Sequence, residues 1–144
     1  MTTKALPSIN AEGALATVLT SQGPRANATA GRPVESKHVL YEDLSTEVGV
    51  WEVTPGTFPA QKDGVWEMMQ FVSGRGRIIH GGGVTEIGPG VSLFTPDGWT
   101  GTWEVEETVR KIYVLHQTHM RLRGIGRTLY RRVVRSAPAR RASP

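Results

Sequence analysis

The stretch PDGWTGTWEVEETVRKIYVL, residues 96–115, indicates most clearly how this chain folds. It opens with a Pro-x-Gly turn and continues with two runs in which apolar and polar residues alternate. A period of two is typical of a β-strand that buries one face. If Gly101 points inward, Trp103 and Val105 point inward with it. In the second run Lys111 shares a face with apolar and aromatic residues, and the pattern leaves open whether that face is the buried one.

The same kind of pattern covers residues 39–115 as a series of short apolar runs. Turn-forming residues interrupt these runs every eight to twelve positions, which is typical of an antiparallel β-sandwich or barrel. We expect tight reversals at Ser73-Gly74 and at residues 88–90, because glycine adopts backbone angles that other residues avoid. The predicted fold class is therefore all-β and antiparallel.

Composition and charge exclude several classes of protein. The chain has 144 residues, a size typical of one domain, and no cysteine, so it has neither disulfides nor thiolate chemistry. Residues 1–115 carry nine Lys/Arg and thirteen Asp/Glu, a net charge of −4, whereas residues 116–144 carry eight arginines and no acid, a net charge of +8. The folded body is therefore mildly acidic, which argues against a nucleic-acid-binding fold.

The chain divides into three predicted zones: an N-terminal arm, partly flexible, at 1–37, a barrel at 38–116, and an Arg-rich tail at 117–144. An apolar stripe predicts a short basic helix in the tail: Leu122, Ile125, Leu129 and Val133. The tail is expected either to contact an acidic partner or surface, or to pack on the barrel or across a dimer. With no signal-peptide pattern and no long apolar run, we expect a cytoplasmic protein without a membrane span.

Short motifs of the β-rich zone occur in a fixed order: GVWEVTPGTF at 49–58, Glu67 with Gly74 downstream, Gly90 with Pro96-x-Gly98 downstream, then GTWEV and VRKIYVL. In this order they resemble the cupin superfamily, and most closely the small single-domain cupins described as ureidoglycine aminohydrolase-like, a group largely of unknown function. The resemblance implies one cupin-type β-barrel, or jelly roll, over residues 38–116. We expect six residues of this barrel to be mainly buried: Trp51, Phe71, Leu93, Phe94, Trp103 and Val114.

Metal-binding cupins generally use a His-x-His pair, a glutamate shortly after it, and a histidine three residues beyond the Pro-x-Gly glycine. Of these ligands only Glu67 is present, and Gly101 stands at the last position. The two possible registers upstream of Glu67 place other residues at the paired positions: Gln61 and Asp63, or Ala60 and Lys62. The sequence therefore predicts no transition metal and no cofactor, and at most a weak oxygen-bound cation.

The predicted pocket combines a carboxylate with apolar and aromatic residues. Glu67 shares its strand face with Met69 and Phe71, so burial should raise its pKa unless a cation partners it, and Lys111 is the best candidate for that cation. We interpret Glu67 and Lys111 as candidate catalytic residues, with a purely structural ion pair of Glu67 with Lys111 or Arg77 as the alternative. Six residues are candidate ligand-binding groups, with core packing as the alternative for several of them: Trp51, Gln61, Asp63, Met69, Trp103 and Tyr113.

Two function classes follow from this pocket. The first is an enzyme, independent of metal or weakly dependent on it, that performs a hydrolase, isomerase or lyase reaction on a small polar metabolite. The second is a non-catalytic ligand-binding or assembly module with a degenerate metal site. Trp66 and Trp99 lie beside turns, where they either rim the pocket or cover a contact between subunits. We expect a homodimer, because a small open sheet leaves edges and apolar surface that a second copy can cover.

Overall fold

The structure is a computed structural model of the chain and describes residues 5–118. These residues form one short helix and nine strands, and the strands belong to a single sheet. In chain order the elements are α1 (Ala11–Ala16), β1 (Thr20–Pro24), β2 (Ala30–Gly31), β3 (Val34–Glu42), β4 (Thr46–Val53), β5 (Gly56–Gln61), β6 (Val65–His80), β7 (Gly83–Ile87), β8 (Ser92–Thr95) and β9 (Thr100–Gln117).

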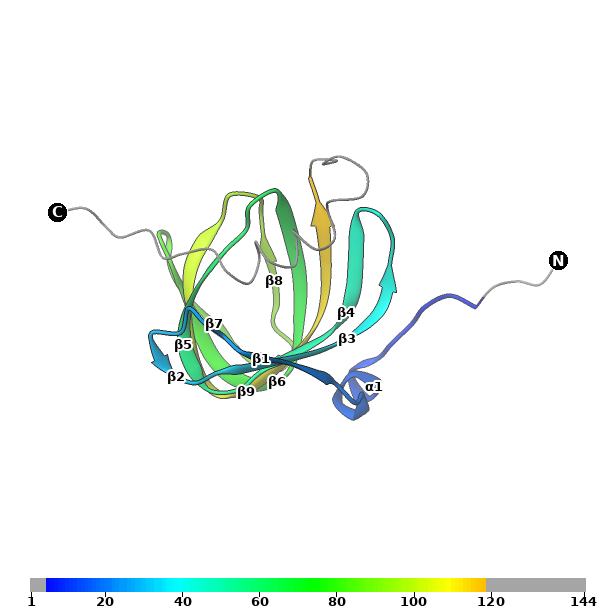
Figure 1. The fold of residues 1–144 in the computed structure, drawn as a ribbon, viewed down its shortest axis with the longest axis horizontal. Coiled ribbons are helices and arrows are strands. Elements are labelled where there is room, and N and C mark those ends of the chain that lie inside the picture. The colour runs from blue at the N-terminus through cyan, green and yellow to red at the C-terminus, as the bar shows by residue number, and fades with distance from the viewer. Residues whose placement is uncertain (1–4, 119–144) are drawn as a thin grey trace.

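The sheet curls into a half-barrel, which Figure 1 shows as a U in cross-section. Along one path the strand order is β1-β3-β4-β9-β5-β2, while β6 pairs with β7, β8 and β9. Every pairing is antiparallel. The prediction of an all-β, antiparallel fold is therefore confirmed for the described part of the chain.

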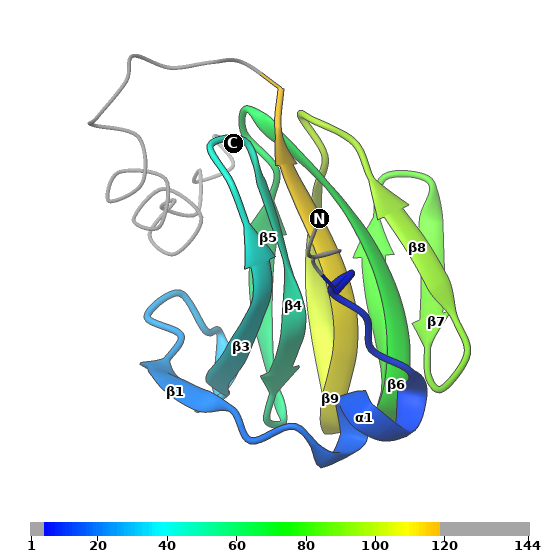
Figure 2. The same cartoon turned by 90° about the vertical axis from the view of Figure 1, so that its right-hand side faces the viewer.

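Two long strands, β6 and β9, form the spine of the sheet (Figure 2). They pair along most of their length, and the pairing shifts register between Phe71 and Gly76. The prediction of a reversal at Ser73-Gly74 was wrong, because β6 continues through these residues as a bulged strand. Gly74 has φ +90°, and a Cβ placed there would lie 2.2 Å from the Thr108 carbonyl oxygen. Glycine thus permits the bulge and the close approach to β9.

Alternate residues of the two long strands point into the concave side. On β9 the buried residues include Trp103 and Val105, as predicted from Gly101. The face of Lys111 is also buried, which answers the question that the sequence left open. The main apolar cluster of the half-barrel is Val53, Phe58, Met69, Phe71, Ile78, Ile87, Trp103, Val105, Val109 and Tyr113.

The predicted burial of individual residues is correct only in part. Phe71 and Trp103 are buried, and three others are half-buried: Trp51, Leu93 and Val114. Phe94 was predicted wrongly, because its side chain is 58% exposed. It lies opposite Met68 on the convex face of the sheet, while its neighbour Leu93 packs against the core.

The N-terminal residues contribute more to the sheet than the expected arm at 1–37 suggested. Strands β1 and β2, and the start of β3, all precede residue 38 and pair with other strands. Helix α1 lies against β6 and β9 (Figure 2), and Arg110 donates hydrogen bonds to three carbonyl oxygens at its C-terminal end: Ala14, Leu15 and Thr17. The expected basic helix of the tail lies outside the described residues. No helix within residues 5–118 is long and apolar enough to cross a bilayer.

Candidate functional site

The concave side of the half-barrel contains a cavity of about 120 Å³. This volume is enough for several water molecules or a small organic ligand. The cavity is lined by aromatic, apolar and charged side chains from the N-terminal strands as well as from the spine: Gln22, Arg25, Glu35, Lys37, Glu47, Trp51, Phe58, Ala60, Gln61, Lys62, Glu67, Trp103, Lys111, Tyr113 and Leu115.

Three charged side chains form a group at one side of this cavity. The carboxylate of Glu67, on β6, accepts a hydrogen bond from the Lys111 ammonium of β9 at 2.5 Å. Its other oxygen accepts a hydrogen bond from Lys62, which lies between β5 and β6. Glu67 and Lys111 are buried, and the side chain of Lys62 is 11% exposed. We call Lys62, Glu67 and Lys111 the charged triad.

The triad determines the protonation of its members. Burial alone would raise the pKa of Glu67, but the Lys111 and Lys62 ammonium groups outweigh burial and lower it to about 2. Burial lowers the pKa of Lys111, and Lys62 lowers it further, while Glu67 opposes both effects. Glu67 is therefore ionised at neutral pH and cannot act there as a proton donor. Burial was expected to raise the pKa of Glu67 unless a cation partners it, and the structure shows two such partners, the expected Lys111 and also Lys62.

Two tryptophans hold the Lys111 ammonium from the other side. Its Nζ atom lies 4.5 Å from the ring centroid of Trp51 and 5.0 Å from that of Trp103. The two rings meet edge to face, with centroids 5.7 Å apart and planes at 73°. Cation–π attraction of this kind stabilises an ammonium group that has lost most of its water. The aromatic wall and the triad thus form one connected unit.

The remaining charged groups of the cavity form separate pairs. Arg25 contacts Glu35 at 2.5 Å, and its guanidinium lies 4.1 Å from the Phe58 ring centroid. Lys37 contacts Glu47 at 2.8 Å, and the Tyr113 hydroxyl donates to the same carboxylate at 2.7 Å. No buried side-chain nitrogen or oxygen within residues 5–118 lacks a hydrogen-bond partner. Each buried polar atom of the cavity wall therefore has at least one hydrogen-bond partner.

Comparison with known proteins agrees with this architecture. The family model described as the EutQ-like cupin domain matches residues 41–113, just over half of the chain. The chain belongs to the cupin superfamily. No curated protein matches it. The matched residues include β6, most of β9 and the charged triad, but not β1, β2 or residues 34–40 of β3.

Solved cupin structures share the fold at low sequence identity. A protein of unknown function from Pseudomonas syringae pv. tomato str. DC3000 has a TM-score of 0.63 and 24% identity, over 69% of this chain and 45% of its own. This chain thus spans less than half of that protein's length. The Clostridium difficile EutQ protein has a TM-score of 0.53 and 22% identity, over 61% of this chain and 71% of its own. A putative EutQ protein from Salmonella typhimurium LT2 has a TM-score of 0.52 and 16% identity, over 71% and 96%.

The residues at the metal-ligand positions of this cupin do not fit a transition metal. Glu67 is engaged by two ammonium groups, and the upstream positions contain no histidine. At Gly101 a Cβ would lie 2.5 Å from the Trp99 ring and 2.8 Å from the Ile79 carbonyl oxygen, so the ring closes over the place of the last ligand. Within residues 5–118 no group of three or more His, Cys, Asp and Glu side chains is arranged to hold a metal ion.

Most of the residues predicted for the site lie at the cavity. Glu67 and Lys111 line it together with four of the six candidate ligand-binding residues: Trp51, Gln61, Trp103 and Tyr113. Met69 is fully buried in the core, where its sulfur lies 3.7 Å from Lys111 Nζ. Asp63 is exposed and does not line the cavity.

Sequence reasoning missed five charged residues of the cavity: Arg25, Glu35, Lys37, Glu47 and Lys62. The sequence did point to the position of Lys62, because in one of the two possible alignments Lys62 stands where metal-binding cupins have a histidine. The first three belong to the segment that was expected to be an arm. Only the pairing of distant strands brings them to the cavity, and no local pattern indicates such a pairing.

Proposed function

We propose that this cupin binds a small organic molecule in the cavity of the half-barrel. The observation that carries the proposal is the charged triad, which is buried beside an open volume and not within the packed core. Buried ion pairs rarely stabilise a protein more than apolar residues of the same size, since both charges lose their water. A cluster of this kind next to a cavity is better suited to ligand recognition.

We also propose a catalytic role for the cavity. Glu67 and Lys111 were both expected to be catalytic residues, but their protonation assigns them different roles. Glu67, with a pKa of about 2, serves as a fixed anion that positions the two lysines. Lys111, whose pKa burial lowers, is the group suited to proton transfer. We propose this role for any hydrolase, isomerase or lyase reaction on a small polar metabolite. The resemblance to ureidoglycine aminohydrolase-like cupins supports the hydrolase option, and the donor set supports a reaction independent of metal.

A non-catalytic binding or assembly module is the alternative. The dense apolar cluster around Phe58, Met69 and Phe71 supports it, because these side chains fill much of the half-barrel. The cavity that remains beside the triad favours ligand binding over a purely structural role.

The test is to fill the cavity without touching its charges. Ala60 lines the cavity, so Ala60→Phe places a ring in the open volume, while Val84→Phe adds the same ring on exposed β7 as a control. Amide NMR spectra are recorded with a panel of small alcohols, amides, carboxylates and amines. We expect wild type and Val84→Phe to show shifts centred on the cavity residues, and folded Ala60→Phe to lose them. No cavity-centred shift in wild type with any compound contradicts the proposal.

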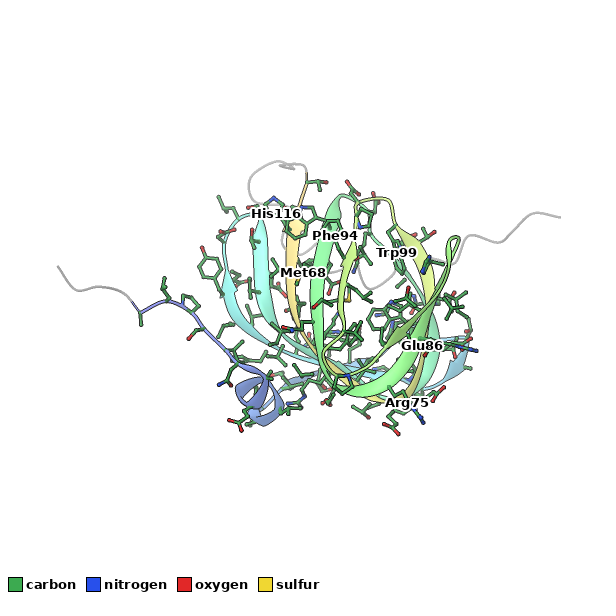
Figure 3. All side chains as sticks on the ribbon, turned by 180° about the vertical axis from the view of Figure 1, so that it is seen from behind. Met68, Arg75, Glu86, Phe94, Trp99 and His116 are labelled. Atoms are coloured by element: carbon green, nitrogen blue, oxygen red, sulfur yellow. The ribbon has the colours of Figure 1, made fainter. Side chains whose placement is uncertain are left out.

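A homodimer is a separate proposal, supported by an apolar group on the convex face of the sheet (Figure 3). The Trp66 ring lies 5.6 Å from Phe94 and 5.2 Å from His116, measured between centroids, and Met68 pairs with Phe94 across β6 and β8. We call these four residues the convex patch. A second copy of the chain would cover Phe94 and Met68, which are 58% and 40% exposed. Contact of the Arg-rich tail with an acidic partner stays a prediction, since residues 119–144 lie outside the described structure.

A further inference from the structure

We propose that the ligand of the cavity is a small carboxylate with an apolar or planar body, bound by the Lys62 side of the charged triad. This inference rests on the proposed function, because it names the class of molecule that the same cavity takes. It follows from the charges that line the cavity and from how they pair.

The described side chains of the cavity carry one more positive than negative charge. Four cations line it, namely Arg25, Lys37, Lys62 and Lys111, and three carboxylates, namely Glu35, Glu47 and Glu67. Arg25 and Lys37 each have a carboxylate within 2.8 Å. The two remaining lysines share the single carboxylate of Glu67. Within residues 5–118 the excess charge therefore lies at the triad.

Lys62 is the more accessible of the two triad lysines that line the cavity. An ammonium group carries three N–H donors, and within the described chain the only side-chain acceptor of Lys62 is Glu67. Its side chain lines the cavity and remains 11% exposed. Lys111 is more enclosed, between Glu67, the Met69 sulfur and the faces of two tryptophans. The N–H groups of Lys62 that do not bind Glu67 are therefore available to a carboxylate in the cavity.

The rest of the cavity wall disfavours cationic and neutral ligands relative to a carboxylate. A cationic ligand would seek the faces of Trp51 and Trp103, but the Lys111 ammonium already occupies them and repels a second cation. A neutral amide of the same shape fits the volume but gains no charge-assisted hydrogen bond. The apolar lining by Phe58, Ala60 and Leu115 suits a hydrocarbon or planar body attached to the anionic group. One excess positive charge matches one carboxylate.

The experiment compares probes of similar size whose end group is an anionic carboxylate, a neutral amide or a cationic amine. Benzoate, benzamide and benzylamine, together with propionate, propionamide and propylamine, are titrated by NMR at constant ionic strength in a buffer without carboxylates. Lys62→Gln removes the excess charge and leaves Glu67 paired with Lys111, so the fold is kept. Lys62→Arg keeps the charge. Arg77→Gln removes one cation from the exposed Arg77–Glu104 pair and serves as the matched control.

We expect each carboxylate to bind wild type at least about 10-fold more tightly than its amide, and the amines not to bind. Lys62→Gln should abolish this preference, whereas Lys62→Arg and Arg77→Gln should retain it. If amides or amines bind the cavity as tightly as the carboxylates, the inference is wrong while the proposed function stands. Equal loss of carboxylate binding in Lys62→Gln and Arg77→Gln also overturns the inference, because the loss then follows from the net charge of the protein and not from the position of Lys62. If no probe binds, the inference fails, and the proposed function fails with it when the small alcohols of the first panel do not bind either.

Discussion

Replacement of Glu67 by glutamine tests the charged triad directly, because the change removes the shared carboxylate charge and keeps the shape of the side chain. In the folded protein the pKa of Glu67 falls from 4.5 to about 2. One pKa unit corresponds to about 1.4 kcal/mol, so the ionised group contributes about 3 kcal/mol to the free energy of unfolding at neutral pH. Breaking a buried ion pair from one side typically costs about 3 to 5 kcal/mol, which is of the same size. We expect Glu67→Gln to lose about 3 kcal/mol at pH 7.

The dependence on pH gives a sharper test than the loss alone. Because the folded pKa lies below the unfolded one, the stabilisation by Glu67 is complete above pH 4.5 and disappears as the pH falls toward about 2. Urea unfolding followed by tryptophan fluorescence, in steps from neutral pH to about pH 2, should show wild type and Glu67→Gln converging in this window. Glu104→Gln, which removes a carboxylate from an exposed ion pair, is the control and should change little. A loss below about 1 kcal/mol at pH 7, or a gap that does not narrow in acid, refutes the reasoning.

Four further outcomes are expected. Arg110→Ala removes both the hydrogen bonds to the end of α1 and the ion pair with Glu52, and should cost about 2 kcal/mol in urea unfolding. It should also speed proteolysis of residues 10–19, and unchanged proteolysis contradicts the role of Arg110 at α1. Gly101→Ala crowds the Trp99 ring and should cost about 1–3 kcal/mol, with a smaller loss in a Trp99→Ala background; equal losses in both backgrounds count against the contact. Light scattering should give wild type twice the 15.7 kDa of one chain and Phe94→Asp the mass of a single chain, and a monomeric wild type would rule out the dimer. Elemental analysis of protein purified without a histidine tag should find far less than one equivalent of zinc, nickel, manganese or iron per chain; close to one equivalent, lost with binding on chelation, contradicts the donor analysis.

The sequence predicted inward faces of the spine strands, because these faces repeat every two residues, but it divided β6 and β9 into shorter runs. The face of Gly101 and Trp103 was read correctly for this reason. The error at Phe94 has the same origin, since Leu93 and Phe94 are adjacent and apolar, and a strand can bury only one of them toward the core. At Ser73-Gly74 the positive φ of the glycine was anticipated, but a turn and a bulge both use it. Local patterns thus predicted the backbone angles of single residues better than they predicted whether the chain reverses or continues as a strand.

The candidate site was predictable to the extent that it lies on those strands. Alternation made Lys111 the best candidate partner of Glu67 but left open which face of its strand points inward, and the structure places their charged atoms 2.5 Å apart. Lys62 lies between two strands, where no periodicity applies, so its contact with Glu67 was not predicted. Arg25 and Glu35 precede the cupin motifs and reach the cavity through β1 and β3. Such contacts depend on strand pairing over long sequence separations, which one sequence does not reveal.

The position of β9 in the sheet has a consequence for how the chain folds. β9 pairs with β4, β5 and β6, all of which precede it, and Thr46 lies opposite His116. The sheet therefore cannot close before residue 117 is available, and its closure depends on contacts between distant residues. Domains dominated by such contacts fold in about milliseconds to seconds, far more slowly than helical bundles. During synthesis, a nascent chain that ends before β9 leaves the edges of β4 and β5 unpaired, and it is at this stage that the protein most needs protection from aggregation.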